Sequence, residues 1–105
     1  MTFPFAYEDY PFDDFNWTGM RRSDTNHGFC WIFERDGQLW MNVKVDPDWA
    51  GFWRDLYPSV LPAYHMNKKH WNSVVLDGSV PEKELCSMIS ASYELCGKRK
   101  KINRE

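Results

Sequence analysis

The sequence predicts an α+β fold, in which an antiparallel sheet is packed by helices. Two runs of alternating apolar and polar residues flank an Asp-Gly turn, and two later segments carry helix-start signals followed by apolar residues at helical spacing. The predicted order is strand, strand, strand, helix, strand, helix, which differs from the regular alternation of a parallel βαβ sheet. With 105 residues, the chain has the length of one domain, so we expect residues 1–105 to form a single folding unit.

The strands are predicted from alternation. Phe29, Trp31 and Phe33 alternate with their neighbours, and a second alternating run covers residues 39–45. The turn at residues 35–38 contains Asp-Gly, the pair that favours a tight hairpin. Residues 17–22 can add an earlier strand, and residues 70–76 read as a strand that ends at an Asp-Gly pair.

The helices are predicted from their caps and their period. Asp46 is a candidate N-cap with Pro47 behind it, and the helix from 47 to 57 ends before Pro58. Ser79 and Glu82 have the spacing of a capping box, which predicts a second helix over residues 81–96. The apolar positions of the two segments are expected to face the core: Trp49, Phe52, Trp53, Leu56, Leu85, Met88 and Ile89.

Composition narrows the class of protein. No apolar run approaches the 18 residues of a membrane span, and the first residues lack the basic leader of a signal peptide. We therefore expect a cytoplasmic protein with no membrane partner. Cys30, Cys86 and Cys96 form no C-x-x-C pair, and we interpret them as buried thiols rather than as disulfides or metal ligands.

Charge is distributed unevenly along the chain. The net charge is −2, which argues against binding nucleic acid by bulk electrostatics alone. Acidic residues gather near the start of the chain, at Glu8, Asp9, Asp13 and Asp14. Basic residues gather in a C-terminal tail at about 98–105, which contains Lys98, Arg99, Lys100, Lys101 and Arg104.

The stretch YHMNKKHWNSVVLDG, residues 64–78, concentrates the polar side chains that could carry function. His65 and His70 are five residues apart, a spacing that turns them away from each other on a helix or a strand, so a shared metal ion is not expected. No nucleophile turn and no phosphate-binding glycine loop is present, so we expect neither an enzyme nor a bound cofactor.

Contact with a partner is the remaining interpretation of this stretch. Lysines can meet phosphates, amides can meet base edges, and rings can stack on bases. Tyr64 and Trp71 have an alternative role as anchors of the loop and the strand. The candidate nucleic-acid-binding residues are Asn67, Lys68, Lys69, His65, His70, Asn72, Lys98, Arg99, Lys100 and Lys101.

The sequence also resembles the MmcQ/YjbR family of small bacterial proteins. The resemblance rests on YPSVLPAYHMNKKHWNSVVLDGSVPEKEL at residues 57–85, on YPF at residues 10–12, and on a strand followed by Asp-Pro at residues 43–47. It implies a CyaY-like fold and DNA binding through a double-wing arrangement. Members of the family carry a helix before YPF, whereas nine residues precede it here, so that helix is expected to be shortened or absent.

Three functions therefore compete. The first is a non-enzymatic DNA-binding protein that contacts phosphates through Lys68, Lys69 and the basic tail. The second, taken from the resemblance to frataxin-like folds, is a metal or small-ligand module that uses the acidic N-terminal residues. The third is a structural or interaction role without nucleic acid. The sequence leaves the oligomeric state open.

Overall fold

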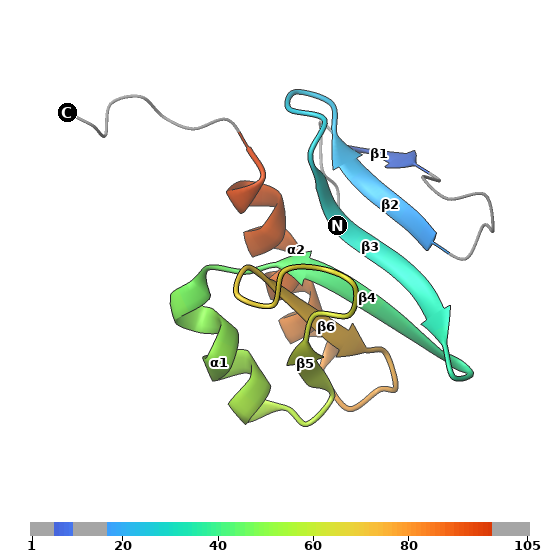
Figure 1. Ribbon diagram of the computed structural model, residues 1–105, viewed down its shortest axis with the longest axis vertical. Coiled ribbons are helices and arrows are strands. Elements are labelled where there is room, and N and C mark those ends of the chain that lie inside the picture. The colour runs from blue at the N-terminus through green and yellow to red at the C-terminus, as the bar shows by residue number, and fades with distance from the viewer. Residues whose placement is uncertain (1–5, 10–16, 98–105) are drawn as a thin grey trace.

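The computed structural model describes residues 6–9 and 17–97, which form one antiparallel sheet and two helices (Figure 1). The strands are β1 (Ala6–Asp9), β2 (Trp17–Arg22), β3 (Gly28–Arg35), β4 (Gln38–Lys44), β5 (Val60–Pro62) and β6 (Trp71–Val75). The helices are α1 (Pro47–Leu56) and α2 (Glu82–Leu95). The strand order across the sheet is β1-β2-β3-β4-β6-β5, and every neighbouring pair is antiparallel. The predicted α+β class is confirmed.

The predicted hairpin forms β3 and β4. Its two turn residues, Asp36 and Gly37, have φ values of 55° and 76°. Two successive positive φ angles define a type I′ turn, whose twist matches that of the flanking strands. The turn sets the register in which Phe33 lies opposite Trp40 and Ile32 lies opposite Met41.

One face of the sheet packs against the helices. Cys30, Val43 and Val74 project from this face into a core that includes Met88 and Tyr93 of α2. Asp46 caps α1 as predicted, because its side chain accepts a hydrogen bond from the Asp48 N–H at 2.9 Å. Figure 1 shows α2 behind the sheet and the loop of residues 62–70 in front of it.

Two expectations about the elements need correction. Two strands, β1 and β5, lie in segments that the sequence did not predict as strands. The predicted capping box is wrong: the N-cap of α2 is Pro81, which makes no side-chain hydrogen bond. The Ser79 hydroxyl instead lies 2.6 Å from that of Ser59 and 2.7 Å from Asp77 Oδ1.

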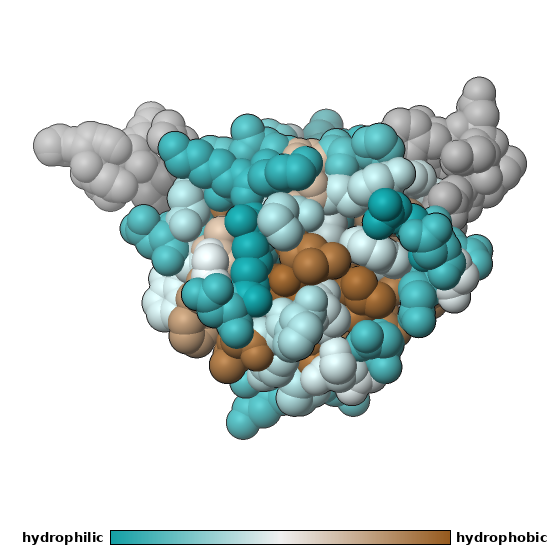
Figure 2. Space-filling model, turned by 60° about the horizontal axis from the view of Figure 1, so that its bottom comes forward, coloured by the Kyte–Doolittle hydropathy of each residue, from teal (hydrophilic) through white to brown (hydrophobic). Residues whose placement is uncertain are grey.

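The predicted core face of α1 is also wrong. Trp49, Phe52 and Leu56 are 54%, 48% and 49% exposed, whereas Ala50 is buried and Trp53 is half-buried against the core. Ala50 lets the helix approach β6 closely, since the Ala50 carbonyl accepts a hydrogen bond from buried Asn72 at 3.3 Å. Figure 2, which views the molecule from below Figure 1, shows apolar surface surrounded by hydrophilic side chains. On α2, Met88 is buried and Leu85 and Ile89 pack against the core, as predicted.

Candidate functional site

The loop of residues 62–70 is attached to the face of the sheet opposite the helices. Asn42 Nδ2 donates to the Tyr64 carbonyl at 2.9 Å, and the Tyr64 N–H donates to Ser73 Oγ at 2.8 Å. The Ser73 hydroxyl donates in turn to Asn42 Oδ1. Asn42 and Ser73 are fully buried neighbours on β4 and β6. Because buried polar groups are costly to leave unpaired, these bonds hold the start of the loop firmly on the sheet.

The Tyr64 ring adds an aromatic anchor. It stacks on Phe33 with centroids 5.7 Å apart, and the Arg35 guanidinium lies 4.2 Å from its centroid. Phe33 also stacks on Trp17 at 4.1 Å. These contacts agree with the interpretation of Tyr64 as a structural anchor of the loop. His65, next to it, is exposed and has a φ of 65°.

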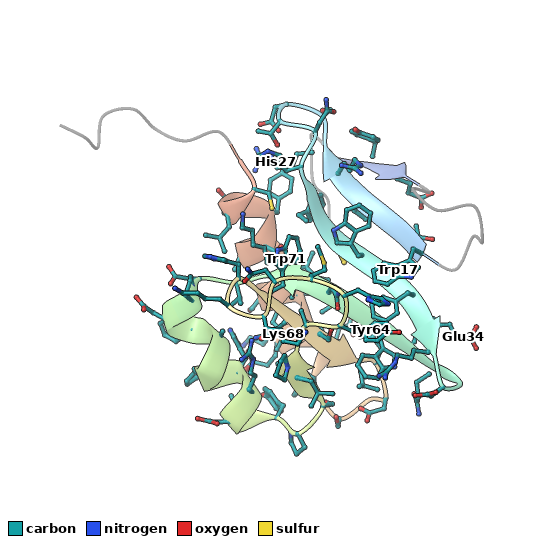
Figure 3. All side chains as sticks on the ribbon, viewed as in Figure 1. Trp17, His27, Glu34, Tyr64, Lys68 and Trp71 are labelled. Atoms are coloured by element: carbon teal, nitrogen blue, oxygen red, sulfur yellow. The ribbon has the colours of Figure 1, made fainter. Side chains whose placement is uncertain are left out.

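The tip of the loop is fixed by bonds to its own backbone. Asn67 Oδ1 accepts hydrogen bonds from the N–H groups of Lys69 at 2.9 Å and His70 at 3.2 Å. From α1, Arg54 donates to the carbonyl of Lys68 and, at 3.4 Å, to that of Trp71. The loop backbone is thus held while the side chains of Lys68 and Lys69 remain exposed. Figure 3 labels Lys68 on this loop.

The predicted site residues are only partly brought together. His65, Asn67, Lys68 and Lys69 are exposed on this loop, and His70 is half-buried at its end. The predicted tail residues Lys98, Arg99, Lys100 and Lys101 lie outside the described residues.

Asn72 requires a correction. Its side chain is 2% exposed and faces α1, where Oδ1 accepts from Arg54 Nε at 2.7 Å and Nδ2 donates to Ala50. Both ends of the amide are engaged, so Asn72 holds α1 and the loop in place rather than offering a contact to bases.

Two grooves lie on either side of the loop, and sequence reasoning missed most of their lining. The first, about 590 Å³ in volume, is lined by Arg35, Trp40 and residues 61–68. The second, about 290 Å³, is lined by residues from β2, the β2–β3 turn, β3, β4, the loop, β6 and the C-terminal end of α2: Arg21, Asn26, His27, Gly28, Trp31, Lys44, Met66, Trp71 and Cys96. For Trp31, strand alternation could have indicated which face of the sheet it lies on, because residues 31 and 33 project from the same face.

The charges around the grooves are of one sign. Arg35 and Lys68 line the first groove, and Arg21 and Lys44 line the second. Among the described residues that line them there is no Asp or Glu. An anion that enters either groove therefore meets basic side chains among the described lining residues.

The described residues contain no group of three or more His, Cys, Asp or Glu side chains that could hold a metal ion. His65 and His70 are separated by the bend of the loop that Asn67 stabilises. The expectation that they bind no shared metal remains a prediction. Neither helix of the described part of the chain has the length and hydropathy to cross a membrane.

The comparison with known families bears on all of these residues. Residues 1–95 match the family model described as YjbR. The chain belongs to the YjbR family. The match includes the 62–70 loop and every lining residue of the two grooves except Cys96.

Relatives and solved structures agree with this assignment. The uncharacterized protein YjbR of Escherichia coli K12 is 33% identical over 66 residues, covering 63% of this chain and 56% of that protein. YbdF of Escherichia coli O157:H7 is 40% identical over 62 residues, covering 59% of this chain and 51% of that protein. This chain thus spans about half the length of these curated relatives.

Two solved structures extend the similarity to most of the fold. A protein from Deinococcus radiodurans superposes with a TM-score of 0.80 at 33% identity, over 95% of this chain and 75% of that chain. A protein from Pseudomonas syringae gives a TM-score of 0.79 at 29% identity, over 88% of this chain and 87% of that chain. The fold described here is therefore shared with solved proteins from two bacteria.

Proposed function

We propose that this YjbR-family protein is a non-enzymatic, cytoplasmic DNA-binding protein that contacts phosphates through its 62–70 loop. The observation that carries the proposal is the pair of exposed lysines, Lys68 and Lys69, on a backbone held by Arg54 and Asn67. Holding the backbone in place lowers the entropy that is lost when the lysines meet phosphates.

The surroundings of the loop support the proposal. Arg35 and Lys68 line the larger groove, and no described lining residue there is acidic. Phosphate contacts supply most of the affinity of a protein for DNA, and they require a surface of this sign. His65 and Asn67, also exposed, supply hydrogen-bonding groups beside the lysines.

The test is DNA binding measured over a salt series. Each lysine that meets a duplex phosphate contributes about 0.9 to the slope of log affinity against log salt. We expect Lys68→Gln with Lys69→Gln to flatten the slope by nearly two units. The matched control is Lys83→Gln, because Lys83 is an exposed lysine on α2, which packs on the opposite face of the sheet.

Three results would contradict the proposal. Absence of binding at about 50 mM salt, where phosphate contacts are strong, would refute it. A change of slope in Lys83→Gln that is half of the change in the double variant would show that the lysines act through net charge alone, because the control removes one charge and the double variant removes two. A loss confined to deletion of residues 98–105 would move the contact from the loop to the basic tail.

A further inference from the structure

We propose that the smaller groove, between Trp31 and Trp71, holds the base of an unpaired nucleotide. This inference rests on the proposed DNA binding and names the form of DNA that the site prefers. Its strongest support is the position of the Trp31 ring against two glycines, together with the basic side chains that line the groove.

The Trp31 ring lies against the backbone of two glycines, Gly19 and Gly28. A Cβ atom added to Gly19 would lie 2.4 Å from Cζ3 of the indole, and one added to Gly28 would lie 2.2 Å from Cζ2. The ring thus occupies the space that side chains at both positions would fill. The Arg21 guanidinium lies 5.1 Å from the ring centroid, so the aromatic surface is paired with a cation.

The opposite walls come from β6 and the loop. Trp71 lies on the same face as Ser73, with Lys44 opposite it on β4, and Met66 approaches from the loop. Both Trp71 and Met66 are half-buried, so part of each remains accessible. Figure 3 shows Trp71 next to the loop that carries Lys68.

The size of the groove suits one base. Its volume of about 290 Å³ is at the lower limit of pockets for small molecules, which start at about 300 Å³, and is too small for a double helix. Aromatic rings stack on any of the bases, because every base has a π face. Arg21, Lys44 and His27 line the groove beside the rings, where a phosphate attached to that base would need a cation.

An unmet hydrogen-bond donor points to a polar ligand. The Trp31 indole N–H is buried and has no hydrogen-bond partner among the described residues. An indole nitrogen can only donate, and nucleobases carry carbonyl and ring-nitrogen acceptors at their edges. A base edge is one source of the acceptor that the described residues do not supply.

The groove is continuous with the proposed phosphate contact. Met66 lines both grooves, and Lys68 and Lys69 follow it in the same loop. A strand whose phosphates meet the lysines can therefore place a base beside Trp31. Bases in a duplex are already stacked and paired, and removing one costs energy, so the groove favours single-stranded DNA.

The indole N–H resonances of the six tryptophans offer a direct test by NMR. The probes are an eight-nucleotide oligothymidine, a duplex of the same length, and thymidine monophosphate. Trp31→Phe assigns the Trp31 resonance by its loss, and Trp71→Leu does the same for Trp71. We expect both resonances to shift with the oligothymidine, and Trp71→Leu to weaken its binding about ten-fold, as loss of one stacked base implies.

Trp49 is the internal control, because it is 54% exposed on α1 and would report unspecific stacking. A shift of Trp49 without Trp31 would overturn the nucleotide site. Shifts confined to the backbone amides of residues 67–69 would overturn the site but leave the proposed DNA binding intact. Absence of any response at about 50 mM salt would refute both proposals.

Thymidine monophosphate distinguishes the source of the nucleotide. A full shift of Trp31 with the monophosphate, and none with the strand, would support the groove as a site for free nucleotides and overturn its link to DNA. A stronger response to the strand would support the proposal as stated, since the lysines then add to the binding.

Discussion

Gly19→Ala tests directly whether the Trp31 ring packs against the backbone of Gly19. The added Cβ would lie 2.4 Å from Cζ3 and 2.6 Å from Cε3 of the indole, whereas ordinary contacts are 3.4–4 Å. The ring would have to move by about 1 Å, the difference between 2.4 and 3.4 Å, although Arg21 lies over it. Overpacking of this kind costs about 1–3 kcal/mol, so we expect about 2 kcal/mol and a fall in Tm of about 10 °C.

The assay is urea unfolding, with a second glycine as the matched control. Gly51 lies inside α1, where an added Cβ would meet nothing within 4 Å. Gly51→Ala should therefore stabilise the protein by about 0.5–1 kcal/mol, because alanine is the better helix former. A decrease in the free energy of unfolding below about 0.5 kcal/mol for Gly19→Ala would refute the packing of the Trp31 ring against Gly19. So would its failure to couple, by about 1 kcal/mol, with Trp31→Val in a double-mutant cycle.

Phe52→Ala should cost below about 1 kcal/mol in thermal unfolding, because Phe52 is 48% exposed, whereas Phe33→Ala should cost about 3–5 kcal/mol at a site that is 2% exposed. Equal losses would show that α1 turns its aromatic face inward. Burial raises the pKa of the Cys30 thiol to about 12. A thiol reagent at pH 8 should therefore modify half-buried Cys86 first and Cys30 only after unfolding, as mass spectrometry can show. The stability that the neutral Cys30 thiol contributes should be complete below about pH 8.5, the pKa of an unfolded cysteine, and fall as pH rises toward 12.

The central part of the fold was predictable because local and global signals agree there. The β3–β4 hairpin combines alternation with a turn pair that accepts two positive φ angles. The start of α1 has its cap and its proline in the expected places. The two missed strands are short: β1 has four residues and β5 has three, and β5 ends at Pro62. Strands of this length depend on pairing with a neighbour more than on their own sequence.

The core face of α1 was not predictable from its period. An aromatic stripe shows which residues share a side of the helix, but not which element that side meets. Helix α1 packs beside β5 and β6 at the edge of the sheet, where Ala50 allows a close approach and Trp53 fills the interface. The remaining apolar positions then face solvent.

The candidate site shows the same division. The exposed lysines follow from the polar character of the loop, but the role of Asn72 depends on strand parity, since residues 71 and 73 share one face and residue 72 projects from the other. Arg54 was not predicted at all, because its bonds join α1 to a loop that begins several residues later. Sequence alone gives no indication of that pairing.

The net charge of −2 agrees with the proposed DNA contact once the location of the charges is considered. The acidic residues of the helical side include Asp46 and Asp48 at the start of α1, and Glu82 and Glu84 in the first turn of α2. The charged side chains that line the two grooves are basic: Arg35, Lys68, Arg21 and Lys44. Under the proposed DNA contact, we expect phosphates to approach this side of the protein rather than the acidic starts of the helices. We therefore expect a salt-sensitive rate of association with DNA that Lys68→Gln or Lys69→Gln lowers far more than Lys83→Gln does, although each of the three single substitutions changes the net charge by one.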